Sequence, residues 1–87
     1  MAGRASRFWP VGAILAAFVR QGCEVRIAEA TMPLPDGDSL SLRYLRRPDT
    51  GDFVALVDLA DDDQVAESEV AFWEQRLGVG IERPAPN

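Results

Sequence analysis

The chain has 87 residues, with nine arginines, one cysteine, no histidine and a net charge of −5 at neutral pH. This length supports one domain with one core, and a lone cysteine cannot form an internal disulfide. The absence of histidine excludes histidine general bases, Ser-His triads and histidine-ligated metals.

Charge is distributed unevenly along the chain. Residues 1–48 carry seven arginines and four acidic residues, a balance of +3, whereas residues 49–87 carry two arginines and ten acidic residues, a balance of −8. An acidic protein is a poor general binder of nucleic acid, because affinity for phosphates needs local positive charge. The chain is therefore electrically two-ended.

The first predicted elements are a loose arm over residues 1–8 and a helix over residues 10–21. Proline is favoured at the first helical position, which Pro10 would occupy, and Gly22 would end the helix in the left-handed conformation. Helical spacing predicts one buried apolar stripe, formed by Val11, Ile14, Leu15 and Phe18. Arginines before an apolar run also resemble a secretion signal, but Arg20 occupies the place of a small-residue cleavage site. We expect a cytoplasmic protein that keeps this helix, and the apolar run is too short to cross a membrane.

Three strands are predicted next, over residues 23–29, 39–46 and 52–59. The first two alternate apolar and polar residues, and the third is apolar on both faces over most of its length. Residues 30–39 contain two prolines and a glycine and form the first connection. In the second connection, Gly51 would take the left-handed conformation that closes a hairpin turn. Alternation places Ser41, Arg43 and Leu45 on the open face of the sheet, with either Val54 and Leu56 or their neighbours beside them.

The last predicted element is a helix over residues 62–77, followed by a tail over residues 83–87. Asp61 followed three residues later by Gln64 matches a capping box, and acidic residues suit the positive end of a helix dipole. The buried stripe of this helix would consist of Ala66, Val70, Trp73 and Leu77. The sequence therefore predicts a single domain of the α+β class with the order α-β-β-β-α, a three-stranded antiparallel meander, and both helices on one face.

The order of elements resembles the HicA-type toxins, which are small mRNA interferases with a fold like that of double-stranded-RNA-binding domains. Three local patterns carry the resemblance: a helix ending in glycine before an apolar strand (AFVRQGCEVRI), a hairpin with a polar turn, and a helix ending Leu-Gly-Val (WEQRLGV). The resemblance spans most of residues 11–79 and implies the same fold. The family places a catalytic histidine in a Gly-Ser-His signature, where this chain reads Gly37-Asp38-Ser39-Leu40-Ser41. Ribonuclease activity is therefore not implied.

Two kinds of residue with reactive potential are interpreted as structural. Cys23 opens a strand after a glycine and has no base to activate it, so we predict a small core residue. Asp58 and residues 61–63 could gather a hard cation, but their spacing does not match a calcium loop, and helix capping explains them. The sequence thus predicts no catalytic residue, no metal site and no cofactor.

An acidic surface is the leading candidate for a binding site. Residues 58–74 carry seven carboxylates and no basic residue. Such a surface could imitate a phosphate backbone and occupy the basic groove of a nucleic-acid-binding protein. Small acidic inhibitors of phage origin, such as anti-CRISPR and anti-restriction proteins, resemble this chain in size and charge. We therefore hypothesise a bacterial or phage protein-binding module, an inhibitor, with the contact residues Asp61, Asp62, Asp63, Glu67, Glu69 and Glu74.

Two other functions stay open. Arginines beside an aromatic ring suit contacts with phosphates and bases, so one alternative is an RNA-binding domain that uses Arg43, Tyr44, Arg46 and Arg47. The other is a structural subunit that forms a homodimer through an edge of the sheet. The first alternative predicts salt-dependent affinity for RNA, and the second predicts a stable dimer in light scattering.

Overall fold

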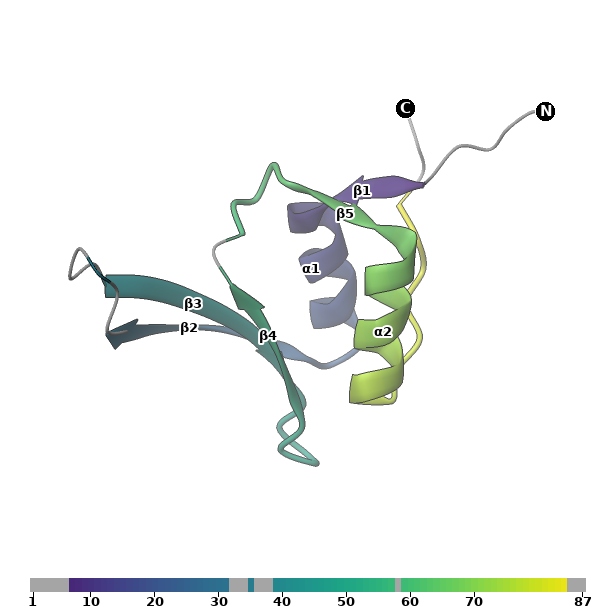
Figure 1. Cartoon of the computed structure of the whole chain (residues 1–87). Helices are drawn as coiled ribbons and strands as arrows, with labels where there is room; N and C mark the ends of the chain where they lie inside the picture. Colours follow the sequence, from purple (N-terminus) through teal and green to yellow (C-terminus); the bar gives the residue numbers. More distant parts are fainter. Residues whose placement is uncertain (1–6, 32–34, 36–38, 58, 85–87) are drawn as a thin grey trace.

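The computed structural model describes residues 7–31, 35, 39–57 and 59–84. A three-stranded antiparallel sheet lies on one side of two helices, and a smaller sheet of two short strands lies at one end of the helices (Figure 1). The elements in chain order are β1 (Phe8–Pro10), α1 (Val11–Arg20), β2 (Glu24–Thr31), β3 (Ser39–Arg46), β4 (Phe53–Val57), β5 (Gln64–Ala66) and α2 (Glu67–Leu77). The predicted α+β class, the meander and the placement of both helices on one face are confirmed.

The larger sheet has the order β2-β3-β4, and its central strand supplies part of the core. Leu45, Val54 and Leu56 lie beneath the helices, with exposed fractions of 0, 6 and 2%. They pack with a cluster from the rest of the chain that consists of Trp9, Val11, Ile14, Leu15, Phe18, Cys23, Val65, Val70, Trp73 and Leu77. Burying a side chain of this kind contributes about 1.5–3 kcal/mol, so this core is the main source of stability.

The predicted positions of the strands are close to the observed ones. β3 has the predicted bounds, β2 ends two residues later than predicted, and β4 ends at Val57 instead of residue 59. Residues 32–34, 36–38 and 58 lie outside the described residues. Within the part of the chain that is described, no helix has the length and apolar character needed to cross a membrane.

The N-terminus of α1 is completed by a distant loop. The amides of Val11 and Gly12 donate to the carbonyl oxygens of Asp63 and Asp61, at 2.7 and 2.9 Å. A Cβ at position 12 would lie 3.2 Å from the Asp61 oxygen, so glycine permits this close approach. The backbone carbonyls of this loop therefore satisfy two of the amides that an isolated helix would leave free at its N-terminus.

Two glycines adopt the left-handed conformation predicted for them. Gly22 has a φ of +98° just after α1, and the amide of Cys23 donates back to the Phe18 carbonyl at 3.1 Å, which closes a Schellman motif. Gly51 has a φ of +82°, and its amide donates to the Arg47 carbonyl at 2.7 Å in the turn between β3 and β4. Both turns thus depend on a residue without a Cβ.

The second helix begins later than predicted. Residues 64–66 form β5, which pairs with β1. Val65 lies opposite Trp9, and both side chains are buried, so the core holds this segment in an extended conformation. α2 therefore begins at Glu67, and the predicted capping box over residues 61–64 is wrong.

The predicted arm over residues 1–8 is in part ordered. β1 begins at Phe8, and the carbonyl of Arg7 accepts a hydrogen bond from the amide of Glu67 at 2.9 Å. The rest of this arm, residues 1–6, lies outside the described residues.

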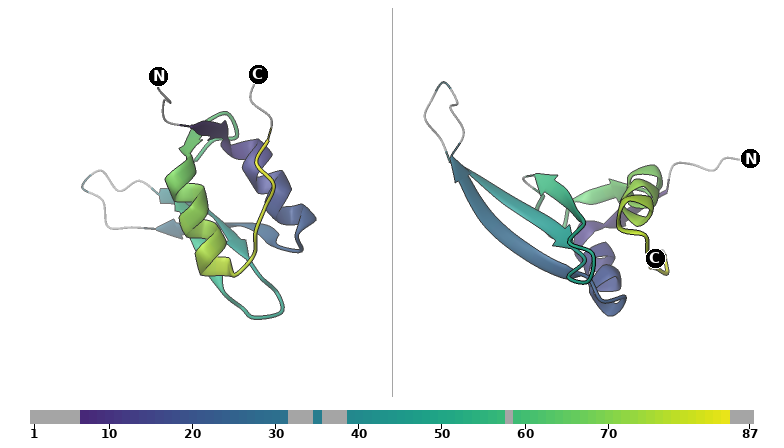
Figure 2. Two further views of the ribbon diagram at one scale, coloured as in Figure 1. Left: turned by 90° about the vertical axis from the view of Figure 1, so that its right-hand side faces the viewer. Right: turned by 90° about the horizontal axis from the view of Figure 1, so that it is seen from below.

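Residues 79–84 form a C-terminal strap over the helices. Figure 2 shows this segment running along α1 and α2 on the side away from the sheet. The indole Nε1 of Trp9 donates to the Pro84 carbonyl at 2.6 Å. The predicted tail over residues 83–87 is therefore fixed at its beginning, and residues 85–87 lie outside the described residues.

Candidate binding site on the open face of the sheet

The face of the larger sheet that points away from the helices carries apolar and aromatic side chains. Because side chains alternate along a strand, the neighbours of the buried core residues point to this open face. On β3 and β4 these neighbours are Leu42, Tyr44, Arg46, Phe53, Ala55 and Val57. Phe53 and Val57 are 49 and 51% exposed. The predicted faces of β3 are thus reversed, since Leu45 is buried and Tyr44 lies on the open face.

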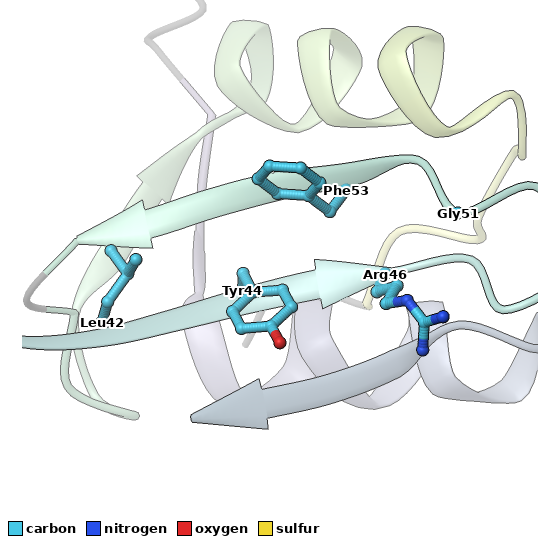
Figure 3. A pocket seen from close by; sticks show the side chains of 5 residues that line it. All are labelled: Leu42, Tyr44, Arg46, Gly51 and Phe53. Atoms are coloured by element: carbon cyan, nitrogen blue, oxygen red, sulfur yellow. The ribbon is translucent and has the colours of Figure 1, made fainter. Parts of the chain in front are cut away.

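A shallow groove of about 280 Å³ crosses the open face (Figure 3). Its lining consists of Leu42, Tyr44, Arg46, Gly51 and Phe53. The rings of Tyr44 and Phe53 meet edge to face, with centroids 5.9 Å apart and an interplanar angle of 72°. Such a pair contributes about 0.5–1.5 kcal/mol beyond its burial, so the aromatic wall of the groove is preformed.

Charged groups border the groove on its β2 side. Glu24 Oε1 accepts hydrogen bonds from Arg26 Nε at 3.0 Å and from Arg46 Nη1 at 3.4 Å. One carboxylate thus serves two guanidinium groups, which leaves an excess of positive charge at this rim. Ion pairs that are partly exposed add little to stability, so their charges are available to a partner.

The predicted arginine site is divided between the two faces of the sheet. Tyr44 and Arg46 lie together on the open face, as described above. Arg43 points to the helix side, where its Nη1 donates to Asp61 Oδ1 at 2.7 Å. The structure therefore brings together only part of the residue set that was predicted to contact RNA.

Arg47 stabilises the hairpin and the end of a helix. Its Nε donates to Asp49 Oδ1 at 3.0 Å, and its Nη1 donates to the Leu77 carbonyl at 3.2 Å. The hydrogen bond between the two side chains raises the pKa of Arg47 and lowers the pKa of Asp49. Because a cation is favourable at the C-terminus of a helix, this position gives Arg47 a structural role.

Two of the predicted acidic contact residues, Glu67 and Glu74, bind the strap. Arg83 donates from Nε to Glu67 Oε2, and from Nη1 and Nη2 to the two oxygens of Glu74, each at 2.8 Å. Glu74 Oε2 also accepts the amide of Ile81 at 2.8 Å. The hydrogen bonds from Arg83, followed by the one from Ile81, lower the pKa of Glu74, and the same pairing raises the pKa of Arg83. These carboxylates therefore attach the strap to α2.

The other predicted acidic residues lie before and on α2. The Asp61 carboxylate binds Arg43, and Asp63 Oδ2 accepts the amide of Ala60 at 2.8 Å. Asp62 and Glu69 are exposed to solvent. Four of the six predicted contact residues are thus engaged within the chain, namely Asp61, Asp63, Glu67 and Glu74.

Cys23 has a structural role. Cys23 is 4% exposed, and burial raises the pKa of its thiol, which disfavours the nucleophilic thiolate. Its predicted place in the core is confirmed. Among the described residues, no group of three or more cysteine, aspartate or glutamate side chains is placed to hold a metal ion.

Sequence reasoning left open whether Phe53 and Val57, or Val54 and Leu56, lie on the open face. β4 is apolar on both faces, so alternation within it did not identify the open one. The position of the hairpin turn could have identified the open face of β4. A turn over residues 48–51 sets Arg46 opposite Phe53 and so fixes the register of the two strands. The aromatic ring then lies on the same face as Tyr44.

Comparison of the chain with protein-family models, with curated proteins and with solved structures found no match. The resemblance to the HicA-type toxins stays a prediction from local patterns. The surface of the fold is therefore the basis for a functional proposal.

Proposed function

We propose that the chain is a non-enzymatic protein-binding module whose contact surface is the open face of the sheet. The uncovered aromatic groove carries this proposal. Tyr44 and Phe53 form its wall, and Phe53 and Val57 are about half exposed, with fractions of 49 and 51%. Contiguous apolar surface of this kind on a soluble domain commonly marks an interaction site.

The residue types of the open face suit a protein partner. Tyrosine and arginine are enriched among the side chains that dominate binding energy at protein interfaces. Arg26 and Arg46 share the single carboxylate of Glu24 at the rim. A partner that places an apolar side chain in the groove and a carboxylate at this rim would match both features. The buried, unpaired Cys23 supports a location in the reducing cytoplasm.

Affinity capture from the source cell tests this proposal, with the wild-type chain and two variants as bait. Phe53→Glu places a charge in the groove and should reduce recovery of a stoichiometric protein partner by more than about tenfold. Phe8→Glu is the matched control, because Phe8 is 52% exposed on β1 and does not line the groove. Both variants must keep the wild-type circular dichroism spectrum. Equal recovery with Phe53→Glu and with the wild type would contradict the proposal.

RNA binding is the second candidate function, and the Tyr44–Phe53 pair beside Arg46 favours it. Bases stack on exposed aromatic rings, and arginine contacts phosphates. The net charge of −5 opposes this function. Under this alternative, nuclease treatment abolishes partner recovery, and labelled RNA binds with an affinity that falls steeply with salt.

The inhibitor hypothesis is a finer version of the protein-binding proposal. It now depends on Asp62 and Glu69, the two predicted contact residues that are exposed to solvent. Reversing both to lysine should weaken binding to a basic, nucleic-acid-binding partner by more than about tenfold. If the partner captured by the wild type binds this double variant equally well, the acidic residues have no part in recognition.

A further inference from the structure

The outer edge of β4 lacks the features that normally protect an edge strand. In the described part of the chain, no strand pairs with this edge. The residues Phe53–Val57 are all apolar, without a charge or a proline. At the opposite edge of the sheet, β2 carries Glu24 and Arg26, and charged side chains discourage pairing with further strands. The two edges therefore differ in their readiness to accept another strand.

The free backbone groups of β4 can be identified from the hairpin. The amide of Arg47 donates to the Asp52 carbonyl at 2.8 Å, so these two residues form a hydrogen-bonded pair. Hydrogen-bonded and non-bonded pairs alternate along antiparallel strands, so Val54 and Leu56 direct their backbone groups to β3. The backbone groups that point to the free edge belong to Phe53, Ala55 and Val57.

α2 presents an exposed stripe beside the same edge. It runs alongside β4 in the opposite direction (Figure 3). Glu69, Phe72 and Arg76 are spaced three and four residues apart, so they lie on one side of the helix, and all three are exposed. Phe72 is 58% exposed, and Phe72 and Arg76 line a groove of about 210 Å³ with three residues of β4. The stripe is acidic at one end, apolar in the middle and basic at the other.

We propose that a second copy of this chain pairs with the edge of β4. Antiparallel pairing about Ala55 uses all the free backbone groups and places Phe53 of one copy opposite Val57 of the other. A two-fold axis through this point brings the Phe72 side chains of the two copies together. It also directs Arg76 of each copy toward Glu69 of the other, because these residues lie on opposite sides of Phe72.

Self-complementarity is the reason to name a second copy as the partner. A two-fold interface requires that one surface match itself when rotated. The β4 edge does so in backbone hydrogen bonds, and the α2 stripe does so in its order of acidic, apolar and basic residues. A five-residue strand and one helix stripe form a small interface, so the dimer should be weak and concentration-dependent. The dimer shares Phe53 and Val57 with the open face, but the backbone edge of β4 and the α2 stripe are not part of that face.

Amide hydrogen exchange by NMR tests the register directly. In dilute solution the amides of Phe53, Ala55 and Val57 should exchange quickly, whereas those of Val54 and Leu56 are protected by β3. Raising the concentration from micromolar to near-millimolar should slow exchange at the first three amides by more than about tenfold as the mass measured by light scattering approaches that of two chains. A chain that stays monomeric over this range, or a dimer in which the Ala55 amide exchanges freely, would overturn the proposal.

Charge reversal tests the contribution of the helix stripe. Glu69→Arg and Arg76→Glu should each weaken the dimer by about fivefold or more, because each places like charges across the axis. The double variant should restore wild-type association, since it exchanges the two charges without changing the pairing. Asp62→Arg is the matched control, an exposed acid outside the stripe, and should have no effect. Failure of the double variant to recover would contradict the proposed pairing of Glu69 with Arg76.

Discussion

The two faces of the β3–β4 hairpin are built from similar residues but have different surroundings. On the covered face, Leu45 and Leu56 are 0 and 2% exposed, whereas Phe53 and Val57 on the open face are 49 and 51% exposed. Both faces are largely apolar. The helices decide which face becomes core, so apolar character alone does not identify the interior of a small sheet.

The largest effect is expected for truncation on the covered face. Leu56→Ala should lower the free energy of unfolding by about 3 kcal/mol, because it removes buried atoms and leaves a cavity. Urea denaturation followed by the fluorescence of Trp9 and Trp73 would measure this loss. The free energy of unfolding of a domain of this size is small, so the variant should be partly unfolded at 37 °C. A loss below about 1 kcal/mol would mean that the core relaxes to fill the space.

The second effect concerns the strap that lies over the helices. Glu74→Gln should cost about 1–2 kcal/mol at pH 7, because it weakens the hydrogen bonds with Arg83. The pKa of Glu74 is lowered in the folded protein, so its contribution is present above its ordinary pKa of 4.5 and is lost as the pH falls through the folded value. Urea denaturation at several pH values should therefore show the wild type and Glu74→Gln converging in acid. A constant difference from neutral pH to pH 3 would contradict the role of this carboxylate.

A smaller effect on stability is expected for the aromatic pair of the open face. Tyr44→Ala removes the edge-to-face contact with Phe53 and should cost about 1 kcal/mol. The same variant should lose most of the binding to a partner of the open face. Comparing unfolding with partner capture separates the two roles, and a cost above about 3 kcal/mol would show that Tyr44 belongs to the core.

The smallest effect is expected for an isosteric change at a half-exposed position. Val57→Thr should change the free energy of unfolding by less than about 0.5 kcal/mol, because threonine has a similar shape and a solvated hydroxyl costs little there. Val54→Thr is its matched control on the covered face, where the buried hydroxyl should cost about 1–3 kcal/mol. Equal effects at both positions would remove the distinction between the faces.

The sequence predicted the elements whose signals are local. The glycine at position 22 and the turn before Gly51 specify their conformations through residues next to them, and both were found as expected. The start of α2 was misplaced, because Val65 is held extended by Trp9, which lies far away in the chain. Contacts of this kind carry no local pattern, so the short strands β1 and β5 were not predicted.

The binding surface was harder to predict than the fold. The acidic residues were read as one surface, but Arg83 engages two of them, Glu67 and Glu74. On the covered side of β3, Leu45 alternates with Arg43 and Arg47. These two arginines led to the prediction that this side faces solvent. In the structure these two guanidinium groups reach past the core, to Asp61 and to the end of α2. Long side chains thus concealed which face the helices cover.

The contacts at the start of α1 have a consequence for cotranslational folding. The first helical amides, at Val11 and Gly12, are satisfied by carbonyls about fifty positions later, at residues 61 and 63. Trp9 finds its partner 75 positions later, at Pro84. These contacts therefore form only after the later residues have been synthesised. The entropy cost of closing such long loops comes before the contacts stabilise the fold. Folding in steps from the N-terminus is disfavoured, and the domain should assemble as one unit once the strap has emerged from the exit tunnel.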